Sequence, residues 1–361
     1  MAGNFVQLHN HTHYSLLDGA SKVPDLVKRV KELGMPAVGI TDHGNMHGAY
    51  ELWRAAVDSG VKPIIGIEAY VTPETARQDK TRVSWDTNWT PVPGHARNPD
   101  DVSGGGLITH LTMWAENDEG LVNLIKASSV ANLEGRVMRY PRMDKEVLST
   151  YSKGVIASSG CPSGIIQTRL RLGQFDEALR AAGEFQDIFG KDNFYIELMD
   201  HGLSIESKVT GDLLTIAKKL GAPLLATNDS HYVMEADKDA QDAMLCINSG
   251  STLDEPGRFK FDGTGYYIKS AEEMRELFKD HPDACDNTLE IAERCNVIFD
   301  DHEDGAFMPQ FDCPEGGDET SLFLKKVEEG LEKRYDGNPP MEVLKQADYE
   351  CGVICQMQFC G

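Results

Sequence analysis

The chain has 361 residues, of which 40% are hydrophobic, so it can fold around a large core and is not typical of a disordered protein. Its 58 acidic and 35 basic side chains leave a net charge of −23, which repels nucleic acid at long range unless bound cations reverse the potential locally. No apolar run approaches the roughly 20 residues of a membrane span, and the start MAGNFVQLHNH does not resemble a signal peptide, so we expect a cytoplasmic protein with no membrane partner.

Strands and helices are predicted to alternate from the start of the chain. Residues 5–8 are short, apolar and followed by HNH, and 24–33 carry apolar residues at helical spacing before Gly34. Further strands are predicted over 37–40, 63–71, 107–114, 154–158, 194–198 and 223–226, with helices over 46–57, 117–131, 175–189 and 205–220. Seven strand-then-helix units favour a parallel sheet or barrel, close to the eight units of a TIM barrel.

A polar, Pro/Gly-rich segment over 72–106 interrupts this alternation. It is too long for an ordinary strand–helix loop, so we interpret it as an insertion or flap. Trp85 and Trp89 could stack on nucleic-acid bases, but packing within the flap is the favoured prediction.

The character of the chain changes after His231. Residues 236–299 are predicted to be helical, with a short hairpin near RFKFDGTGYYIKS. From Asp300 the chain is acidic and Pro/Gly-rich, and a helix is predicted over 320–334. We therefore expect a barrel over 1–235, a helical extension over 236–299 and a separate region over 300–361.

Residues of metal-ligand type lie at the ends of the predicted strands. In a β/α barrel the carboxyl ends of the strands converge on one mouth, so residues far apart in sequence meet there. These residues are His9, His11, His43, Glu68, His110, Cys161, Asp229 and His231. Imidazoles, carboxylates and one thiolate suit Zn, Mn or Fe, and are too rich in nitrogen for a plain Mg or Ca site.

Two spacings strengthen this prediction. On a strand, residues i and i+2 face the same side, so His9 and His11 can reach one metal, and Asp229 and His231 repeat the spacing. Glu68 lies in an apolar strand, where an unpaired carboxylate costs several kcal/mol. A single histidine or cysteine is more often a satisfied side chain or a small buried residue, and the prediction depends on the whole set.

Other histidines and cysteines fit the set less well. His201, which follows the sixth predicted strand, is a candidate for contact with a phosphate. Eight cysteines spread along the chain are not typical of a disulfide framework. Cys351, Cys355 and Cys360 lack the fourth partner and the CxxC spacing of a zinc site.

Long motifs in this sequence resemble the PHP (polymerase and histidinol phosphatase) family, and within it the amino-terminal region of bacterial DNA polymerase III alpha subunits. The motifs are FVQLHNHTHYSLLDGA, GITDHGNMHGAYEL, PIIGIEAYV, LTMWAENDEGLVNL, GCPSGIIQTRLRLG, ELMDHG and PLLATNDSHYV. The run RFKFDGTGYYIKSAEEM resembles the start of the polymerase region, so the resemblance covers nearly the whole chain.

The resemblance implies a distorted seven-stranded (β/α)7 TIM-like barrel, with a mainly helical C-terminal segment that begins the polymerase region over 300–361. It implies nine ligands for two or three divalent ions, Zn or Mn: His9, His11, Asp18, His43, Glu68, His110, Cys161, Asp229 and His231. Asp18 enters the set through the resemblance alone. Catalytic roles are expected for Asp18, His110 and Asp229.

The resemblance also implies the function and partners. We expect a metal-dependent 3′→5′ exonuclease that proofreads during DNA replication, acting on a single-stranded or frayed DNA 3′ end. Its other partners would be the remaining polymerase III domains and replisome subunits. The carboxylates for nucleotide addition are expected beyond residue 361, so this chain should not polymerise DNA alone.

Two other functions fit the same ligands. One is a small-molecule phosphomonoesterase of the same family, which the polymerase-like segment after residue 255 disfavours. The other is a metal-stabilised scaffold for the polymerase, since a ligand set alone does not separate a structural site from a catalytic one.

Overall fold

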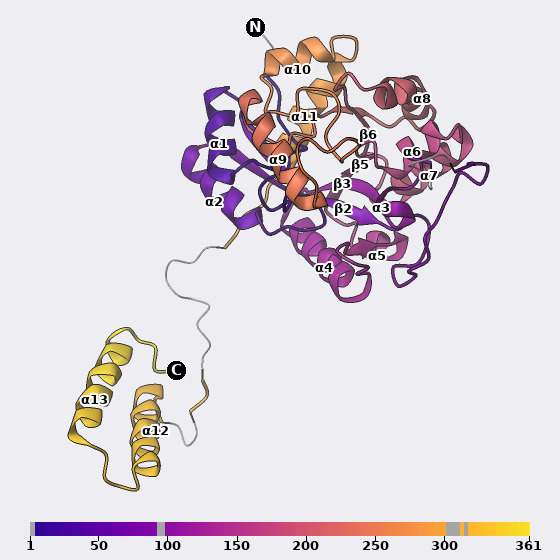
Figure 1. Cartoon of the computed structure of the whole chain (residues 1–361). Helices are drawn as coiled ribbons and strands as arrows, with labels where there is room; N and C mark the ends of the chain where they lie inside the picture. The colour runs from indigo at the N-terminus through magenta and orange to yellow at the C-terminus, as the bar shows by residue number, and fades with distance from the viewer. Residues whose placement is uncertain (1–3, 92–97, 301–310, 314–316) are drawn as a thin grey trace. The chain divides into compact units, whose positions relative to one another are not determined.

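The computed structural model describes residues 4–91, 98–300, 311–313 and 317–361 (Figure 1). The chain divides into two compact units, Met1–Phe299 and Asp300–Gly361, and each is described by itself. No helix in these ranges is both long enough and apolar enough to cross a membrane.

The first unit is built on a mixed sheet. Its described strands are β1 (Ala37–Ile40), β2 (Lys62–Val71), β3 (Thr109–Ala115), β4 (Arg142–Met143), β5 (Val155–Ser158), β6 (Phe194–Leu198) and β7 (Leu224–Ala226). The strand order is β1-β2-β3-β5-β6-β7, and β4 pairs with β2. β3 runs antiparallel to both β2 and β5, while the other pairs are parallel. The purely parallel arrangement favoured by the strand–helix alternation is therefore wrong for β3, and the predicted distorted barrel is confirmed.

An extended segment near the start of the chain joins the two ends of this sheet. Gln7 bridges to Val38 in β1, and Asn10 bridges to Ser230 just after β7, both in parallel. The predicted strand over 5–8 is thus an extended segment held by isolated bridges. Because it lies between β1 and the end of β7, it brings the first and last ligand pairs together.

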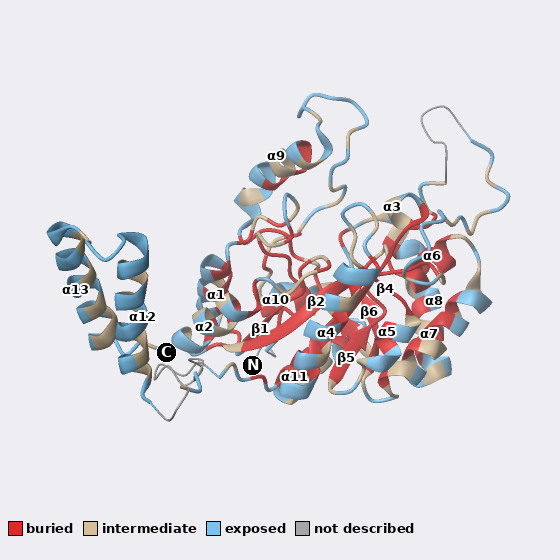
Figure 2. Cartoon of the chain, turned by 90° about the horizontal axis from the view of Figure 1, so that it is seen from below, coloured by how far each residue is buried: buried red, intermediate tan, exposed pale blue. Residues whose placement is uncertain are grey.

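Helices pack outside the sheet (Figure 2). In the first unit they are α1 (Val23–Glu32), α2 (Ala49–Ser59), α3 (Ser103–Gly106), α4 (Asp118–Glu134), α5 (Lys145–Thr150), α6 (Ile165–Arg171), α7 (Phe175–Phe189), α8 (Ser204–Leu220), the 3-10 helix η1 (Glu235–Asp237), α9 (Lys238–Ser249), α10 (Ala271–Leu277) and α11 (Pro282–Arg294). The sequence did not predict β4, α3, α5 or α6. The hairpin expected near 258–270 is also wrong, since this stretch forms only one bridge, between Tyr267 and Tyr232.

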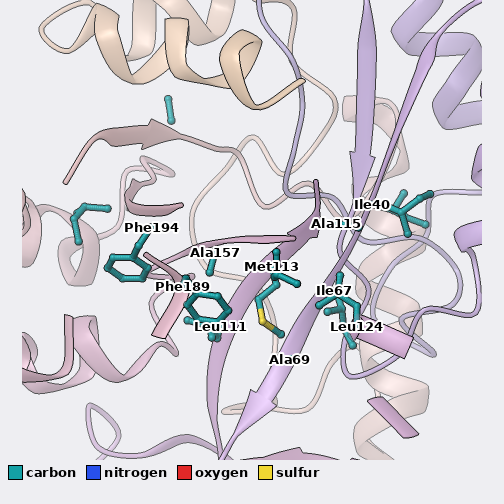
Figure 3. Packing of buried hydrophobic residues seen from close by; sticks show 14 of the residues in the cluster. Ile40, Ile67, Ala69, Leu111, Met113, Ala115, Leu124, Ala157, Phe189 and Phe194 are labelled. Carbon is teal, nitrogen blue, oxygen red and sulfur yellow. The ribbon is translucent and has the colours of Figure 1, made fainter. Parts of the chain in front are cut away.

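The core lies between the sheet and these helices (Figure 3). Ile67 in β2, Met113 in β3 and Ala157 in β5 are all buried in it. α4 approaches β5 so closely that a Cβ on Gly120 would lie 1.7 Å from the carbonyl oxygen of Gly154.

The described part of the 72–106 insertion packs onto the barrel. Trp85 contacts the core, and the guanidinium of Arg169 lies 3.8 Å from the centre of its ring. Gln174 donates a hydrogen bond to the Trp85 carbonyl. The ring of Trp85 is therefore occupied by the protein's own residues, as the packed-flap prediction requires.

The second unit contains α12 (Glu319–Arg334) and α13 (Met341–Gln356). Asp318 caps α12 by accepting a hydrogen bond from the backbone N–H of Ser321. The helix predicted over 320–334 is confirmed by α12, while α13 was not predicted.

Candidate metal centre

All nine predicted ligands lie together at one end of the barrel. His9 and His11 lie on the extended first segment, and Asp18 in the loop that follows it. His43 follows β1, Glu68 lies in β2 and His110 in β3. Cys161 follows β5, and Asp229 and His231 follow β7.

Glu68 is the centre of this cluster. Its carboxylate oxygens lie 2.6 Å from His43 Nδ1, 3.1 Å from His110 Nδ1, 3.4 Å from His11 Nε2 and 3.6 Å from His9 Nε2. The side chain is only 1% exposed. A carboxylate so deeply buried, with four imidazoles around it, is suited to bind a cation.

Asp229 approaches the same imidazoles from the opposite end of the sheet. Its Oδ1 lies 3.1 Å from His11 Nε2 and 3.4 Å from His9 Nε2. Its backbone has a φ of 43°, in the left-handed region that aspartate tolerates better than most residues. The local backbone is thus strained in order to present this carboxylate to the cluster.

Two further candidate ligands, Asp18 and Cys161, lie at the edge of the cluster. Asp18 Oδ2 is 3.0 Å from His43 Nε2, and Cys161 Sγ is 3.4 Å from His110 Nδ1. Asp18 is therefore placed with the set, although no strand-end pattern had identified it.

In each of three histidines, one ring nitrogen makes a hydrogen bond and the other makes none. His9 donates from Nδ1 to Glu197 at 2.7 Å, and His231 donates from Nδ1 to the Asp229 carbonyl at 2.8 Å. Ser15 gives its hydroxyl proton to Asp42, so His11 Nδ1 donates to Ser15 at 2.9 Å. When each ring is neutral, its Nε2 atom carries the lone pair that can bind a metal.

Those free nitrogens are among the buried polar atoms that have no hydrogen-bond partner. The orphaned atoms at this site are His9 Nε2, His11 Nε2, Asp18 Oδ1, His43 Nδ1, both Glu68 carboxylate oxygens, Asp229 Oδ1 and His231 Nε2. Leaving one such atom unpaired costs about 1–3 kcal/mol. This many buried nitrogen and oxygen atoms, close together and without hydrogen-bond partners, fit a site that holds cations.

Electrostatics differ between the rings of the site. Burial opposes protonation of His9, but Glu197 and Asp229 raise its pKa well above the usual value, and a bound cation would displace that proton. Burial, together with His43 and His231, lowers the pKa of His11 to about 3, so its ring is neutral at pH 7, the form that binds metals. Burial opposes ionisation of Glu68, but His110 and His43 hold the pKa of its carboxyl well below its usual range. Burial and the neighbouring Glu68 raise the pKa of the Cys161 thiol, an effect that a bound cation would reverse.

The ligand atoms form three overlapping groups, each with its atoms within 4.8 Å of one another. The groups are His11, His43 and His231; His9, His11 and Asp229; and His43, Glu68 and His110. Because His11 and His43 each belong to two groups, the arrangement suits adjacent cations that share ligands.

One face of the cluster opens into a cavity of about 450 Å³. Asp18, His43, His110, Cys161, Asp229 and His231 line it, whereas the rings of His9 and His11 lie fully buried beneath. A substrate entering this cavity would meet the exposed side of any bound cations.

His201 lines the same cavity, but its ring is already engaged. Nδ1 lies 2.7 Å from a Glu206 carboxylate oxygen and Nε2 lies 2.9 Å from the Asn228 carbonyl oxygen. The ring also stacks on Tyr266, with centroids 4.0 Å apart. Neither nitrogen is free to donate to a phosphate, which argues against the predicted phosphate contact.

Glu197 was missed by the sequence reasoning. It is 2% exposed and accepts hydrogen bonds from His9, Ser158 and Thr227. The signal was present, because Glu197 is a carboxylate within an apolar strand, as Glu68 is.

Comparison with known proteins gives a consistent family. A family model described as PHP domain matches residues 7–201. DNA polymerase III subunit alpha of Mycobacterium leprae is 49% identical over 99% of this chain, and that of Borreliella burgdorferi is 38% identical over 99%. The match covers 30% and 29% of those proteins, so the chain spans about 30% of the length of these curated relatives.

A solved amidohydrolase from Chromobacterium violaceum aligns with 75% of this chain and 96% of its own, at 14% identity and a TM-score of 0.36. The family resemblance seen in the sequence motifs is confirmed by the PHP match.

Proposed function

The chain belongs to the PHP domain family, and from that premise we propose that its metal centre hydrolyses phosphodiester bonds at the 3′ end of DNA. The activity would be a 3′→5′ exonuclease that proofreads for the polymerase of the same alpha subunit. Residues 1–235 would form the catalytic barrel, 236–299 its helical extension and 300–361 the start of the polymerase region. The partners would be a single-stranded or frayed primer end and the remaining replisome.

One observation carries this proposal: buried nitrogen and oxygen atoms without a hydrogen-bond partner converge beside an open cavity. They belong to His9, His11, Asp18, His43, Glu68, Asp229 and His231. Their chemistry, with Cys161 at the edge, suits two or three Zn²⁺ or Mn²⁺ ions. Such ions lower the pKa of a coordinated water and neutralise charge that builds on phosphate oxygens. The open cavity favours a catalytic site over a purely structural one.

The side chains divide between holding and reacting roles. His9, His11 and Glu68 lie beneath the cavity and would hold the cations. Asp18, His110 and Asp229 are among the six candidate ligands that line the cavity, where they could meet the scissile phosphate as well as a cation. Together with the family resemblance, this position supports the catalytic roles proposed for them.

The test is digestion of a primer with a mismatched, labelled 3′ end. Changing Asp229→Asn, or chelating the metals, is expected to lower the rate by at least about tenfold, since loss even of the partners that orient metal ligands costs 10- to 100-fold. Asp239→Asn, which removes an exposed carboxylate of α9 outside the cavity, is the matched control. Undiminished digestion by Asp229→Asn would overturn the proposal.

Two outcomes would identify the competing functions. Faster metal-dependent hydrolysis of a phosphomonoester than of single-stranded DNA would indicate a phosphomonoesterase. Bound metal without hydrolysis of either substrate would indicate a structural site.

A further inference from the structure

The geometry points to a path for a single DNA strand across the metal centre: Arg136 and Arg139 bind upstream phosphates, and Phe259 and Phe261 stack on the terminal base. This rests on the proposed function and specifies how its substrate is held. The strand would enter along a basic groove on one side of the cations, and the departing nucleotide would occupy the cavity on the other side.

Two separate hollows meet at the candidate metal ligands. One is the cavity described above, and the other is a groove of about 460 Å³. Asp18 and His43 line both. Each volume lies within the roughly 300–1,000 Å³ usual for ligand sites. A chain longer than one nucleotide could therefore pass from one hollow to the other across the site.

The groove is basic in a strongly acidic chain. Arg136 and Arg139 line it, and Asp18, itself a candidate ligand, is the one acidic residue among its described lining residues. Both arginine side chains are exposed. Guanidinium groups suit phosphate because their planar donors can form two parallel hydrogen bonds. The net charge of −23 makes this local reversal of sign informative.

The turn that carries the arginines is held firmly by buried contacts. Val137 and Tyr140 exchange two backbone hydrogen bonds of 3.0 Å, which place Met138 and Arg139 at the tip. Beside it, the fully buried Arg142 donates to the carbonyl oxygens of Gly135, Leu107, Arg77 and Asp79.

Ring contacts connect this turn to the metal site. Tyr140 packs edge-on against Tyr70, with centroids 5.1 Å apart, and Tyr70 stacks on His43 at 5.9 Å. Arg139 also donates to Asn248 at 2.6 Å, which fixes its direction. The turn that carries the arginines is thus connected by packed rings to the candidate ligand His43, as phosphate contacts that set the position of a strand require.

The other hollow, the cavity described above, has aromatic rings in its lining. Phe259, Phe261 and Tyr266 line it, and Phe259 is 59% exposed. Phe261 packs edge-on against the candidate ligand His231, with centroids 4.6 Å apart. The exposed ring of Phe259, beside the half-buried ring of Phe261, suits stacking on an unpaired base, which every base allows. The phosphate contacts on one side and the ring contacts on the other set the direction of the strand.

Binding of single-stranded DNA tests the phosphate contacts. The probe is a fluorescent oligothymidylate of about ten nucleotides with uncleavable phosphorothioate linkages at its 3′ end, measured by anisotropy with Mn²⁺ over a salt series. Arg136→Ala with Arg139→Ala is expected to weaken binding at least about tenfold and to reduce the salt slope by about 1.4, for two lost contacts. Lys28→Ala with Lys31→Ala removes the same charge from exposed positions of α1 and should change neither.

An unchanged salt slope in the arginine variant would overturn the groove assignment. The melting temperature and metal content of each variant are measured alongside, and Arg136→Gln with Arg139→Gln provides a second, more conservative pair. The salt slope of this glutamine variant should also fall by about 1.4 if the groove binds phosphate charge.

The aromatic contact is tested with two probes that differ only in the terminal base. Wild type should bind the probe with a 3′-terminal thymine about tenfold more tightly than one with an abasic 3′ end, because base–aromatic stacking is strong. Phe259→Ala should abolish that ratio, and Phe311→Ala, an exposed ring in the other unit, should preserve it. A ratio of one in wild type would overturn the stacking contact.

Failure of the inference and failure of the proposed function give different results. If wild type digests 3′ ends and the arginine variant binds and digests equally well, the strand path is wrong and the exonuclease stands. If wild type, loaded with metal, digests no 3′ end, the proposed function itself fails.

Discussion

The hydrogen bond at Nδ1 of individual rings is the feature that makes these histidines suitable as metal ligands. Glu197, Ser15 and the Asp229 carbonyl each occupy the Nδ1 atom of one histidine, leaving Nε2 to face the cluster. Such outer contacts orient the rings and increase their basicity toward a metal. The geometry of the site therefore depends on these hydrogen-bond partners as much as on the ligands themselves.

Glu197→Gln tests this arrangement. The amide can still accept from His9 but has lost the negative charge, so we expect metal affinity to fall about 10- to 100-fold. Competition with a chromophoric chelator measures the affinity, and Glu272→Gln, an exposed position on α10, is the matched control. Affinity equal to wild type in Glu197→Gln would mean that the charge of this carboxylate does not support the site.

At the scale of elements, β3 is positioned by the way its neighbours pack. β3 carries His110, and α4 begins just after it, with Asn117 capping the helix by accepting from the Gly120 N–H. The carbonyl of Gly154, just before β5, lies against this first turn of α4 and accepts from the backbone N–H of Glu116. This close approach requires a residue without a side chain at position 120.

Gly120→Ala should therefore destabilise the barrel. Its Cβ would meet a backbone oxygen at 1.7 Å, and overpacking of this kind costs about 1–3 kcal/mol. Gly211→Ala in α8 is the control, because no atom lies within 4 Å of its Cβ and alanine favours a helix by about 1 kcal/mol. Urea denaturation measures both. Equal stability of the two variants would contradict the packing described.

Elements were predictable from sequence to different degrees. β6 and α7 occur over the predicted residues, because their apolar patterns are long and end sharply. The direction of β3 was not predictable, since the same residues can pair in either sense and only the neighbouring strands decide. β4 has two residues and no pattern of its own, so it exists only through its pairing with β2.

At the scale of the whole molecule, the metal centre joins the two ends of the sheet. Ligands come from the first segment, from β2 and β3, and from the turn after β7, so bound cations would cross-link the barrel. The orphaned atoms would then contribute to stability only when metal is present. The candidate site is therefore expected to stabilise the fold as well as act in catalysis.

Metal removal tests this directly. Chelation followed by dialysis should lower the melting temperature by about 5–10 °C, because ligand at 100 times its Kd adds about 2.7 kcal/mol. Readdition of Zn²⁺ or Mn²⁺ should restore it, and differential scanning calorimetry measures both steps. Asp239→Asn should show the same shift as wild type. A metal-containing sample whose melting temperature is unchanged by chelation would argue against the cross-link.

The sequence by itself determined which residues could be ligands, because residue type and the position of a side chain at a strand end are local properties. Spacing of two residues also predicted that His9 with His11, and Asp229 with His231, would face one way. Asp18 came from family resemblance, since no local pattern distinguishes it.

The tertiary structure alone decided the rest. β3 runs antiparallel to its neighbours, Glu197 lies beside His9, and both ring nitrogens of His201 have hydrogen-bond partners. Arg136 and Arg139 line one hollow beside the ligands, and Phe259 and Phe261 line another. These features depend on contacts between residues far apart in the chain. Strand direction and convergence at the barrel end arise only when the segments pack, so they leave no local pattern in the sequence.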